Sequence, residues 1–320
     1  MSNSDLHPLA PLAAEAHQLA KQHDWPAAAL KLQQLIHEIT QQPVTTLDIN
    51  HDQYSLNSLN GFVTLENGQT FFFKYHHEEG EEGSIQEYYR AELLRQQGFP
   101  VDVPLYASGE PGRQILLYQR RQERRLADVC RDIESQQDWQ NMAPVIQAQQ
   151  NLDKLTLTRT LASLTPASIQ QVTQEPIHQL FYHRLVSPGD VPGFGGRVKQ
   201  FYVGKTFQLG EVFVDWDTLC ELKWEINGVT YPHTLKQLLA ESAQVLNPQA
   251  LSGHGGVVAH GDAHNANVWY NDAPTPPELI LFDPAFAGST CRPFSPKSKR
   301  RFIISSLIRF GCMNQTSLMT

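Results

Sequence analysis

The sequence has few cysteines and no long apolar run. Only four cysteines occur in 320 residues, and no two of them form a CxxC pair: Cys130, Cys220, Cys291 and Cys312. This spacing argues against a disulfide framework or a zinc ribbon and favours a reducing compartment. No stretch of about 18 consecutive apolar residues is present, so we expect no transmembrane helix.

Several functional signals are also missing. The first ten residues, MSNSDLHPLA, carry neither the basic start nor the apolar segment of a secretory signal, so we expect a soluble, cytoplasmic protein. Acidic residues outnumber basic ones by 33 to 25, so we expect no general affinity for nucleic acid or for anionic membranes. There is no GxSxG elbow, no GxxxxGKS/T loop and no HExxH motif. These motifs are typical of α/β-hydrolases, P-loop NTPases and zincin metalloproteases, so their absence argues against these three classes.

Polar side chains concentrate in the stretch 257–288. Its apolar start, Val257–Ala259, predicts a buried strand that ends at HGDAHNAN, residues 260–267. The segments 267–270 and 279–283 then predict the two arms of a hairpin around a proline-rich turn.

The register of that hairpin would decide which polar groups meet. If Asn271 pairs with Leu279, then Asn267 falls opposite Asp283, with Cα atoms about 5 Å apart. An amide oxygen and a carboxylate at that separation suit Mg²⁺, which usually takes one or two ligands from the protein and the rest from phosphate and water. Asp262 would lie beside the ion, where a carboxylate can take the proton of a hydroxyl that attacks phosphorus.

HGDAHNAN followed by LFDPAFAG closely resembles the aminoglycoside phosphotransferase and choline kinase group of small-molecule kinases. The resemblance spans about residues 47–288 and implies an α+β, two-lobed protein-kinase-like fold, with a small β-rich N-lobe and a larger, mainly helical C-lobe. It implies ATP and Mg²⁺ as cofactors, Asp262 as catalytic base and Asn267 and Asp283 as metal ligands. His260 would be a structural residue that hydrogen-bonds the catalytic loop.

Two alternatives to this interpretation stay open. Any one of Asp262, Asn267 and Asp283 taken alone is explained equally well as a turn former or as the end of a strand. A second alternative groups His254, His260, Asp262 and His264 as the zinc site of a hydrolase, because His and Asp suit Zn²⁺.

The first half of the chain predicts a nucleotide-binding sheet. Asn67-Gly68 between two apolar runs predicts a hairpin, and its second arm carries Lys74 in the run FFFKY. A lone Lys in such a strand either reaches solvent at an edge or meets a charge. The resemblance implies that Lys74 holds ATP, paired with a carboxylate on the following helix.

Two carboxylates on the predicted helix 84–97 compete for that pairing. Glu87 completes a capping box with Ser84, whereas Glu92 lies in the apolar stripe of Ile85, Tyr88 and Tyr89. We therefore predict Glu92 as the partner of Lys74 and keep Glu87 as the alternative.

Two further segments are assigned to the nucleotide by position. The segment 54–61 lies where a phosphate-covering loop belongs and offers Ser55, Asn57 and Ser58 as donors. A buried strand is expected at 115–118, and the resemblance implies that the backbone around Tyr118, at the end of that strand, meets adenine. The charge run 120–125 that follows is interpreted as a solvated face rather than a phosphate site.

We expect four parts: a helical extension at 1–43, an ATP-binding small lobe at 44–119, a catalytic and substrate-binding large lobe at 120–290 and a basic tail at 291–320. The chain has no acidic residue after Asp283, and relatives continue there with several helices. Either the reading frame is altered or truncated near 289–291, or the tail is a basic peptide that docks on a partner.

The predicted function is transfer of the γ-phosphoryl group of ATP to a small-molecule hydroxyl. FDPAFAG resembles the Asp-Pro-Ala sequence of fructosamine kinase-like proteins, which favours a sugar or sugar-amine acceptor over an aminoglycoside or an amino alcohol. The alternative is a nucleotide-binding pseudoenzyme or a truncated fragment of such a kinase. The sequence leaves the oligomeric state open.

Overall fold

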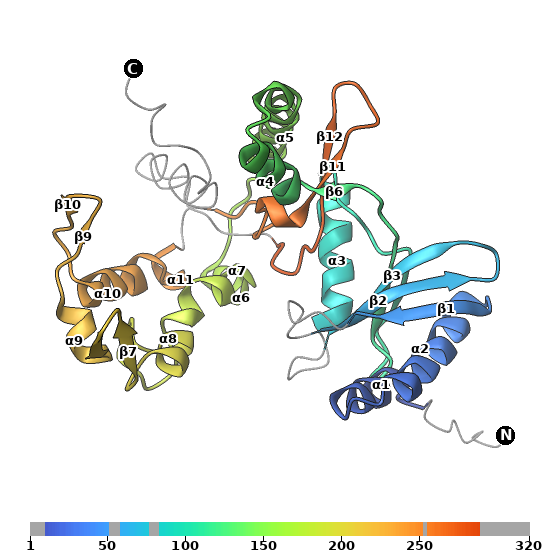
Figure 1. Cartoon of the computed structure of the whole chain (residues 1–320), viewed down its shortest axis with the longest axis horizontal. Coiled ribbons are helices and arrows are strands. Elements are labelled where there is room, and N and C mark those ends of the chain that lie inside the picture. The colour runs from blue at the N-terminus through green and yellow to red at the C-terminus, as the bar shows by residue number, and fades with distance from the viewer. Residues whose placement is uncertain (1–9, 51–57, 77–82, 252–254, 289–320) are drawn as a thin grey trace. The chain divides into compact units, whose positions relative to one another are not determined.

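The computed structural model describes residues 10–50, 58–76, 83–251 and 255–288. The chain divides into two compact units, Met1–Leu155 with Asp262–Ala285 and Thr156–Gly261 with Phe286–Thr320. This division differs from the boundary expected at 119/120, because residues 120–155 and 262–285 group with the sheet. The predicted α+β class is confirmed, since the chain combines antiparallel sheets with helices (Figure 1).

A five-stranded antiparallel sheet dominates the first unit, in the order β1-β2-β3-β5-β4. Its strands are β1 (Val44–Ile49), β2 (Ser58–Leu65), β3 (Thr70–His76), β4 (Tyr106–Ser108) and β5 (Ile115–Gln119). The predicted hairpin is confirmed, because β2 pairs with β3 from Ser58↔His76 to Thr64↔Thr70 and Gly68 has φ +80° in the turn.

Helices cover both faces of this sheet. The helices α1 (Leu12–Lys21) and α2 (Trp25–Thr40) lie along one face, and α3 (Gly83–Gln96) lies on the other side (Figure 1). Side chains on α1, α2 and the facing positions of the strands form one hydrophobic core, which includes Leu12, Leu32, Leu35, Phe71, Phe73, Ile115 and Leu117. The N-terminal helices therefore share the core of the sheet.

Side chains alternate between the two faces of β3, so every second residue of the strand faces α3. Phe71 and Phe73 enter the core with α1 and α2, so Phe72 and Lys74 point to the opposite face. Cross-strand partners share a face, and Lys74 pairs with Leu116 while Phe72 pairs with Tyr118. The period of two thus places Lys74 and Tyr118 beneath α3.

The segment expected to cover phosphate is partly strand. Ser55 and Asn57 lie outside the described residues, whereas Ser58 already begins β2. The prediction of a loop up to Gly61 is therefore wrong, because Gly61 pairs with Ile49 and Phe73 inside the sheet. A Cβ atom on Gly61 would lie 2.0 Å from the Asp48 carbonyl oxygen, so strand packing rather than phosphate binding explains this glycine.

The remaining elements of the first unit follow β5. They are β6 (Arg124–Arg125), α4 (Leu126–Gln136), a 3-10 turn at Trp139–Asn141, α5 (Met142–Ala162), a 3-10 turn at Asn265–Asn267, β11 (Val268–Asn271) and β12 (Glu278–Leu281). The division between the units falls within α5, after Leu155. The strands form a second, three-stranded sheet in the order β12-β11-β6. This small sheet positions the end of the 260–267 loop.

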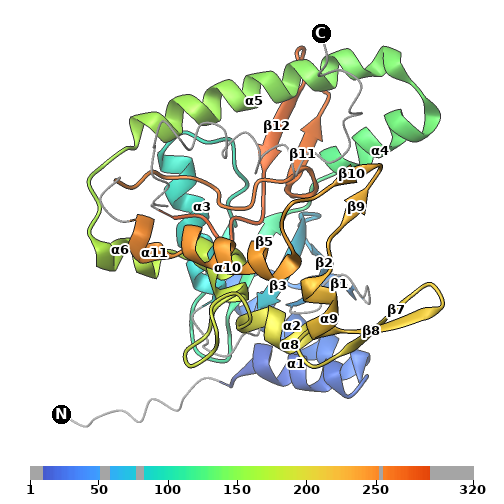
Figure 2. The same cartoon turned by 90° about the vertical axis from the view of Figure 1, so that its left-hand side faces the viewer.

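The second unit consists of short helices and two hairpins. Its helices are α6 (Ile169–Gln174), α7 (Ile177–Leu180), α8 (Gly196–Phe201), α9 (Trp216–Glu221), α10 (Leu235–Val245) and α11 (Pro248–Leu251), with a 3-10 turn at Tyr182–Arg184. The hairpins are β7 (Thr206–Leu209) with β8 (Val212–Asp215) and β9 (Glu225–Ile226) with β10 (Val229–Thr230). Figure 2 shows α9 beside the β7–β8 hairpin, where Val198, Trp216, Leu219 and Cys220 form a core.

One strand prediction fails in this unit. Val257–Ala259 is buried or half-buried, but instead of a strand it lies between two isolated bridges, Thr165↔Gly256 and Ala259↔Gly288. Among the described residues, only single-residue bridges flank this apolar run, so the expected strand does not form. In the described part of the chain, no helix combines the length and apolarity that a membrane crossing requires.

Candidate active site

Lys74 lies at the centre of a buried ionic cluster in the first unit. Its Nζ atom donates to Oε2 of Glu87 at 3.0 Å and to Oδ1 of Asp283 at 2.7 Å. The Lys74 side chain is only 11% exposed, against 2% for Glu87 and 40% for Asp283. One ammonium group therefore links the sheet, α3 and the segment that follows β12.

The predicted pairing of Lys74 with Glu92 is wrong, and the alternative, Glu87, is the partner. Glu87, Ala91 and Leu94 recur at helical spacing and are all buried, so they form the face of α3 that meets the sheet. Glu92 lies outside that face and pairs with Arg95 at 2.8 Å. The aromatic stripe that suggested Glu92 is not the buried face, since Tyr89 is 64% exposed.

Tyr118 contributes its side chain to the same cluster. Its hydroxyl donates to Oε1 of Glu87 at 2.6 Å, so both carboxylate oxygens of Glu87 accept a hydrogen bond. Burial, followed by the negative charge of Glu87, raises the pKa of the Tyr118 phenol well above its ordinary value. The sequence pointed only to the backbone of Tyr118, and an isolated Tyr at the end of an apolar strand was the signal for a buried hydroxyl that needs a partner.

The charge balance at Lys74 favours its protonated form. Burial by itself lowers the pKa of the ammonium group, but the carboxylates of Glu87 and Asp283 outweigh it and raise the pKa above its ordinary value. Lys74 is therefore a fixed positive charge rather than a candidate proton acceptor. Two carboxyl groups thus contact this one ammonium group.

Asp262, His264 and Asn267 form a compact turn between residue 262 and β11. The Asn267 amide nitrogen Nδ2 donates to the Asp262 carbonyl oxygen at 3.0 Å, and the Asn267 backbone N–H donates to the His264 carbonyl at 2.8 Å. His264 Nδ1 accepts from the Ala266 N–H at 3.2 Å, and His264 Nε2 lies 3.9 Å from Asp262 Oδ2. Because the Asn267 amide nitrogen is used within the turn, its oxygen is the atom left for a cation.

The hairpin register differs by one residue from the prediction. Asn271 pairs with Glu278 rather than with Leu279, so Asn267 lies opposite Phe282 instead of Asp283. The Phe282 N–H accordingly donates to the Asn267 carbonyl at 3.0 Å. The turn spans one residue fewer than expected, because a run of prolines and polar residues does not specify the length of a turn. As a result, Asp283 is the residue just after the position paired with Asn267.

Asp283 has an uncommon backbone conformation. Its φ is +56°, in the left-handed region that residues other than Gly, Asn and Asp rarely adopt. Pro284 follows it, and a residue before proline prefers extended backbone. Non-glycine residues held this way cost about 1–3 kcal/mol and cluster at functional sites.

Arg90 is a further residue that sequence reasoning missed. Its Nη1 donates to the Ala285 carbonyl, and its Nη2 donates to Oε1 of Gln86 at 2.6 Å. Arg90 lies three residues after Glu87, about one helical turn. On α3, Glu87 therefore contacts Lys74, and Arg90 contacts the chain just after Asp283. An Arg three residues after a buried Glu was the available signal.

His260 belongs to the second unit, together with Gly261. The His260 side chain is 4% exposed, so it is a buried residue, as a structural role requires. The adjacent Gly261 has φ +82°, and a Cβ atom there would lie 2.3 Å from the Phe286 carbonyl oxygen. The hydrogen bond that the resemblance implies for His260 stays a prediction.

The charge run 120–125 is largely used in contacts. Arg121 pairs with Asp102 and with Glu123, Arg124 pairs with Asp132, and the Arg120 guanidinium lies 4.6 Å from the Phe62 ring centroid. The Arg120 backbone N–H donates to the Thr70 carbonyl at 3.0 Å. The arginines of this run thus form ion pairs or lie over aromatic rings. The predicted adenine contact around Tyr118 stays a prediction.

The zinc interpretation gains no support. Among the described residues, no group of three or more His, Cys, Asp and Glu side chains is placed to hold a metal ion. His254, one of the four residues of that interpretation, lies outside them. The carboxylate of Asp283 and the amide oxygen of Asn267 are oxygen donors, which suit a hard cation such as Mg²⁺ better than Zn²⁺.

No known protein-family profile and no curated protein matches the sequence. Solved structures similar to it include a macrolide 2'-phosphotransferase and a putative fructosamine-3-kinase. A macrolide 2'-phosphotransferase type I aligns at 10% identity over 89% of this chain and 82% of its own, with a TM-score of 0.41. A putative fructosamine-3-kinase from Thermobifida fusca YX-ER1 aligns at 15% identity over 80% and 73%, with a TM-score of 0.34.

Proposed function

We propose that the protein is an ATP-dependent small-molecule kinase that transfers the γ-phosphoryl group to a hydroxyl of its acceptor. The observation that supports this most is the position of Lys74 Nζ, 3.0 Å from Glu87 and 2.7 Å from Asp283. In protein kinases, catalysis needs both a strand Lys paired with a helix Glu and a metal-binding Asp in place. Here the same three residue types meet at one buried ammonium group.

Lys74 would hold the phosphates of ATP. Glu87 is fixed by Tyr118 and Lys74, so it orients the ammonium group whether or not a nucleotide is bound. Asp283 is the more exposed partner, and we propose that phosphate oxygens replace it on Lys74. That exchange would free the Asp283 carboxylate to bind a metal ion.

Asn267 and Asp283 would hold Mg²⁺. Their oxygens fit an ion that takes few protein ligands and completes its shell with phosphate and water. When bound, Mg²⁺ supplies the positive charge that offsets the charge developing on the transferred phosphoryl group.

Asp262 would act as the base. We propose that its carboxylate accepts the proton of the acceptor hydroxyl while that oxygen forms a bond to the γ-phosphorus and the bond to ADP breaks. The Asn267 hydrogen bond to the Asp262 carbonyl holds the turn that carries this carboxylate. The acceptor is a small molecule, and the Asp-Pro-Ala sequence after Phe282 favours a sugar or a sugar-amine over an aminoglycoside or an amino alcohol.

The proposal is tested by the thermal stability of the purified chain with ATP, with and without Mg²⁺. A ligand that binds the folded state raises the melting temperature, so we expect a shift that needs ATP and grows with Mg²⁺. Asp283→Asn should lose the Mg²⁺ increment, whereas the control Glu92→Gln should keep it, because Glu92 pairs only with Arg95 in the described contacts.

The outcomes separate the remaining alternatives. No response to ATP in the wild-type chain overturns the proposed function, and a response to Zn²⁺ alone would revive the hydrolase. Binding of Mg-ATP without phosphoryl transfer to any member of a panel of sugars, sugar-amines, aminoglycosides and amino alcohols would identify the nucleotide-binding pseudoenzyme. The basic tail at 291–320 lies outside the described residues, and its two explanations stay hypotheses.

A further inference from the structure

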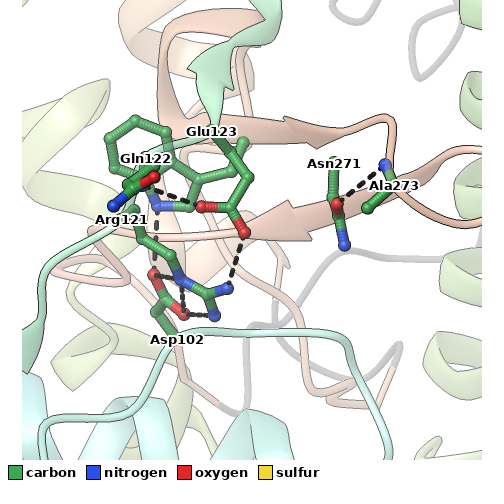
Figure 3. A network of polar contacts seen from close by, with 7 residues as sticks. Asp102, Arg121, Gln122, Glu123, Asn271 and Ala273 are labelled. Atoms are coloured by element: carbon green, nitrogen blue, oxygen red, sulfur yellow. Dashed lines mark hydrogen bonds and ion pairs between the residues drawn. The ribbon is translucent and has the colours of Figure 1, made fainter.

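Asp102 joins two segments that are far apart in the sequence. Its Oδ2 accepts from the Trp269 indole Nε1 at 3.0 Å, and its Oδ1 accepts from Arg121 Nε at 3.0 Å. The Asp102 side chain is largely buried, and Arg121 in turn donates to Glu123 at 3.1 Å (Figure 3). A carboxylate held by a guanidinium from one side is a fixed acceptor for the indole on the other.

The Trp269 ring, held by Asp102, stacks on the ring of Phe282. The two ring centroids lie 4.2 Å apart with the planes inclined by 21°, a stacked arrangement. Trp269 sits in the middle strand of the small sheet, opposite Arg125 on one side and Ile280 on the other. Phe282 is the residue immediately before Asp283.

The backbone before Asp283 is held from two sides as well. The Leu281 N–H donates to the Pro100 carbonyl at 2.7 Å, and the Asp102 N–H donates to the Leu281 carbonyl at 2.8 Å. On the other side, the Phe282 N–H donates to the Asn267 carbonyl at 3.0 Å. Asp102 therefore fixes Leu281 through its backbone and Phe282 through Trp269.

This double restraint accounts for the conformation of Asp283. A left-handed φ of +56° is uncommon even for Asp, and the proline that follows disfavours a helical backbone at this residue. Such a conformation persists only where the neighbouring structure over-determines it. The restraints on Leu281 and Phe282 hold the backbone from which Asp283 leaves β12, while Lys74 holds the Asp283 carboxylate and Arg90 holds the Ala285 carbonyl.

We propose that Asp102 and Trp269 are positioning residues for Asp283. This inference rests on the proposed function, because it assigns them the task of presenting the Asp283 carboxylate to the metal of Mg-ATP. Loss of a group that orients a metal ligand typically weakens metal affinity about 10- to 100-fold. Removing the indole N–H or the Asp102 charge should therefore weaken binding of Mg-ATP and leave binding of metal-free ATP unchanged.

The test uses Trp269→Phe and Asp102→Asn in the full chain. Trp269→Phe keeps an aromatic ring against Phe282 but has no N–H, and Asp102→Asn keeps the shape but not the charge. Tyr270→Phe, at the next position of the same strand, is the matched control. We expect ATP affinity by calorimetry to fall about 10-fold or more with Mg²⁺ in both variants, to stay unchanged in EDTA, and to stay unchanged throughout in Tyr270→Phe.

A double-mutant comparison separates positioning from a general loss of stability. In an Asp283→Asn background the ligand is already gone, so Trp269→Phe should have no further effect on Mg-ATP affinity. Losses that add in the double variant, or that are equally large in EDTA, would overturn the positioning role. Melting temperatures of all variants verify that each chain is folded at the temperature of the titration.

A second readout needs no ligand. Hydrogen exchange of the backbone amides of residues 281–283 should be faster in Trp269→Phe and Asp102→Asn than in the wild type and Tyr270→Phe, because the restraint on this segment is lost. Unchanged exchange would overturn the inference even if the chain is a kinase. A wild-type chain that binds no nucleotide would overturn the proposed function alone, and hydrogen exchange would still decide whether Asp102 and Trp269 order Asp283.

Discussion

The Nζ atom of Lys74 lies 2.7 Å from Oδ1 of Asp283, a residue 209 positions later in the sequence. This contact joins the large sheet to the end of the small one, and Glu87 completes it from α3. Both partners of Lys74 are carboxylates, so the ammonium group holds together three elements that would otherwise carry uncompensated charge.

Lys74→Met should destabilise the first unit by about 3 kcal/mol or more, because removing one partner of a buried ion pair leaves the other charge buried without compensation. The double variant Lys74→Met/Glu87→Gln should recover a large part of that loss, since neither buried charge remains. Urea unfolding followed by circular dichroism measures both. The matched control, Glu92→Gln, removes a solvent-screened pair with Arg95 and should leave the free energy of unfolding nearly unchanged; an equal loss in control and test would contradict this account.

Asp262→Asn should lower phosphoryl transfer about 10²- to 10⁴-fold, the usual contribution of a general base. The variant keeps the Asp262 backbone carbonyl, which is the acceptor of the Asn267 amide, so the turn and nucleotide affinity should be preserved. Steady-state rates together with ATP affinity by calorimetry provide the check. A variant that turns over at the wild-type rate would remove Asp262 from the mechanism.

Stability should fall as the pH rises above about 10. The Tyr118 phenol has a folded-state pKa raised first by burial and then by Glu87, and the pKa of Lys74 is raised by its two carboxylates despite burial. In both cases the unfolded chain releases the proton at a lower pH than the folded chain does, so the stabilisation is complete below the unfolded pKa and is lost above it. Unfolding free energies from urea titrations at pH 9 and pH 11 would show the decline.

Tyr118→Phe isolates the phenol in that pH dependence. Phe cannot ionise, so the slope of stability against pH above about 10 should become shallower by up to about 1.4 kcal/mol per pH unit. At neutral pH the same variant should lose about 1–3 kcal/mol, because Oε1 of Glu87 no longer accepts the phenol hydrogen bond. A slope identical to that of the wild type would show that Tyr118 ionises as easily in the folded chain as in the unfolded one.

Gly261→Ala should be far more harmful than Gly210→Ala. Both glycines have positive φ, so an alanine costs about 1–2 kcal/mol at either position for the left-handed backbone alone. At Gly261 the new Cβ would also lie 2.3 Å from the Phe286 carbonyl oxygen, whereas at Gly210 nothing lies within 4 Å. Melting temperatures of the two variants measure the difference, and equal values would mean that the backbone around Gly261 moves freely enough to accept a side chain.

The sequence alone determined the local elements and the residue types of the site. Asn67-Gly68 specifies its hairpin because both residues tolerate positive φ, and the run FFFKY has a strand period that separates Lys74 from its aromatic neighbours. Through the resemblance, HGDAHNAN and FDP predicted Asp262, Asn267 and Asp283 as a group, and the structure shows the short turn that joins Asp262 to Asn267. These signals are local and need no knowledge of what packs against them.

Tertiary structure decided which of these groups meet. The helical wheel of α3 allowed either Glu87 or Glu92 to face Lys74, and only packing on the sheet made Glu87 the buried one. The hairpin register depended on the length of a proline-rich turn, and a shift of one residue moved Asp283 beyond the paired strand. The contact of Asp102 with Trp269 spans 167 positions, and no periodicity in a sequence encodes a pairing at that distance, because it depends on where two sheets and a helix place their side chains.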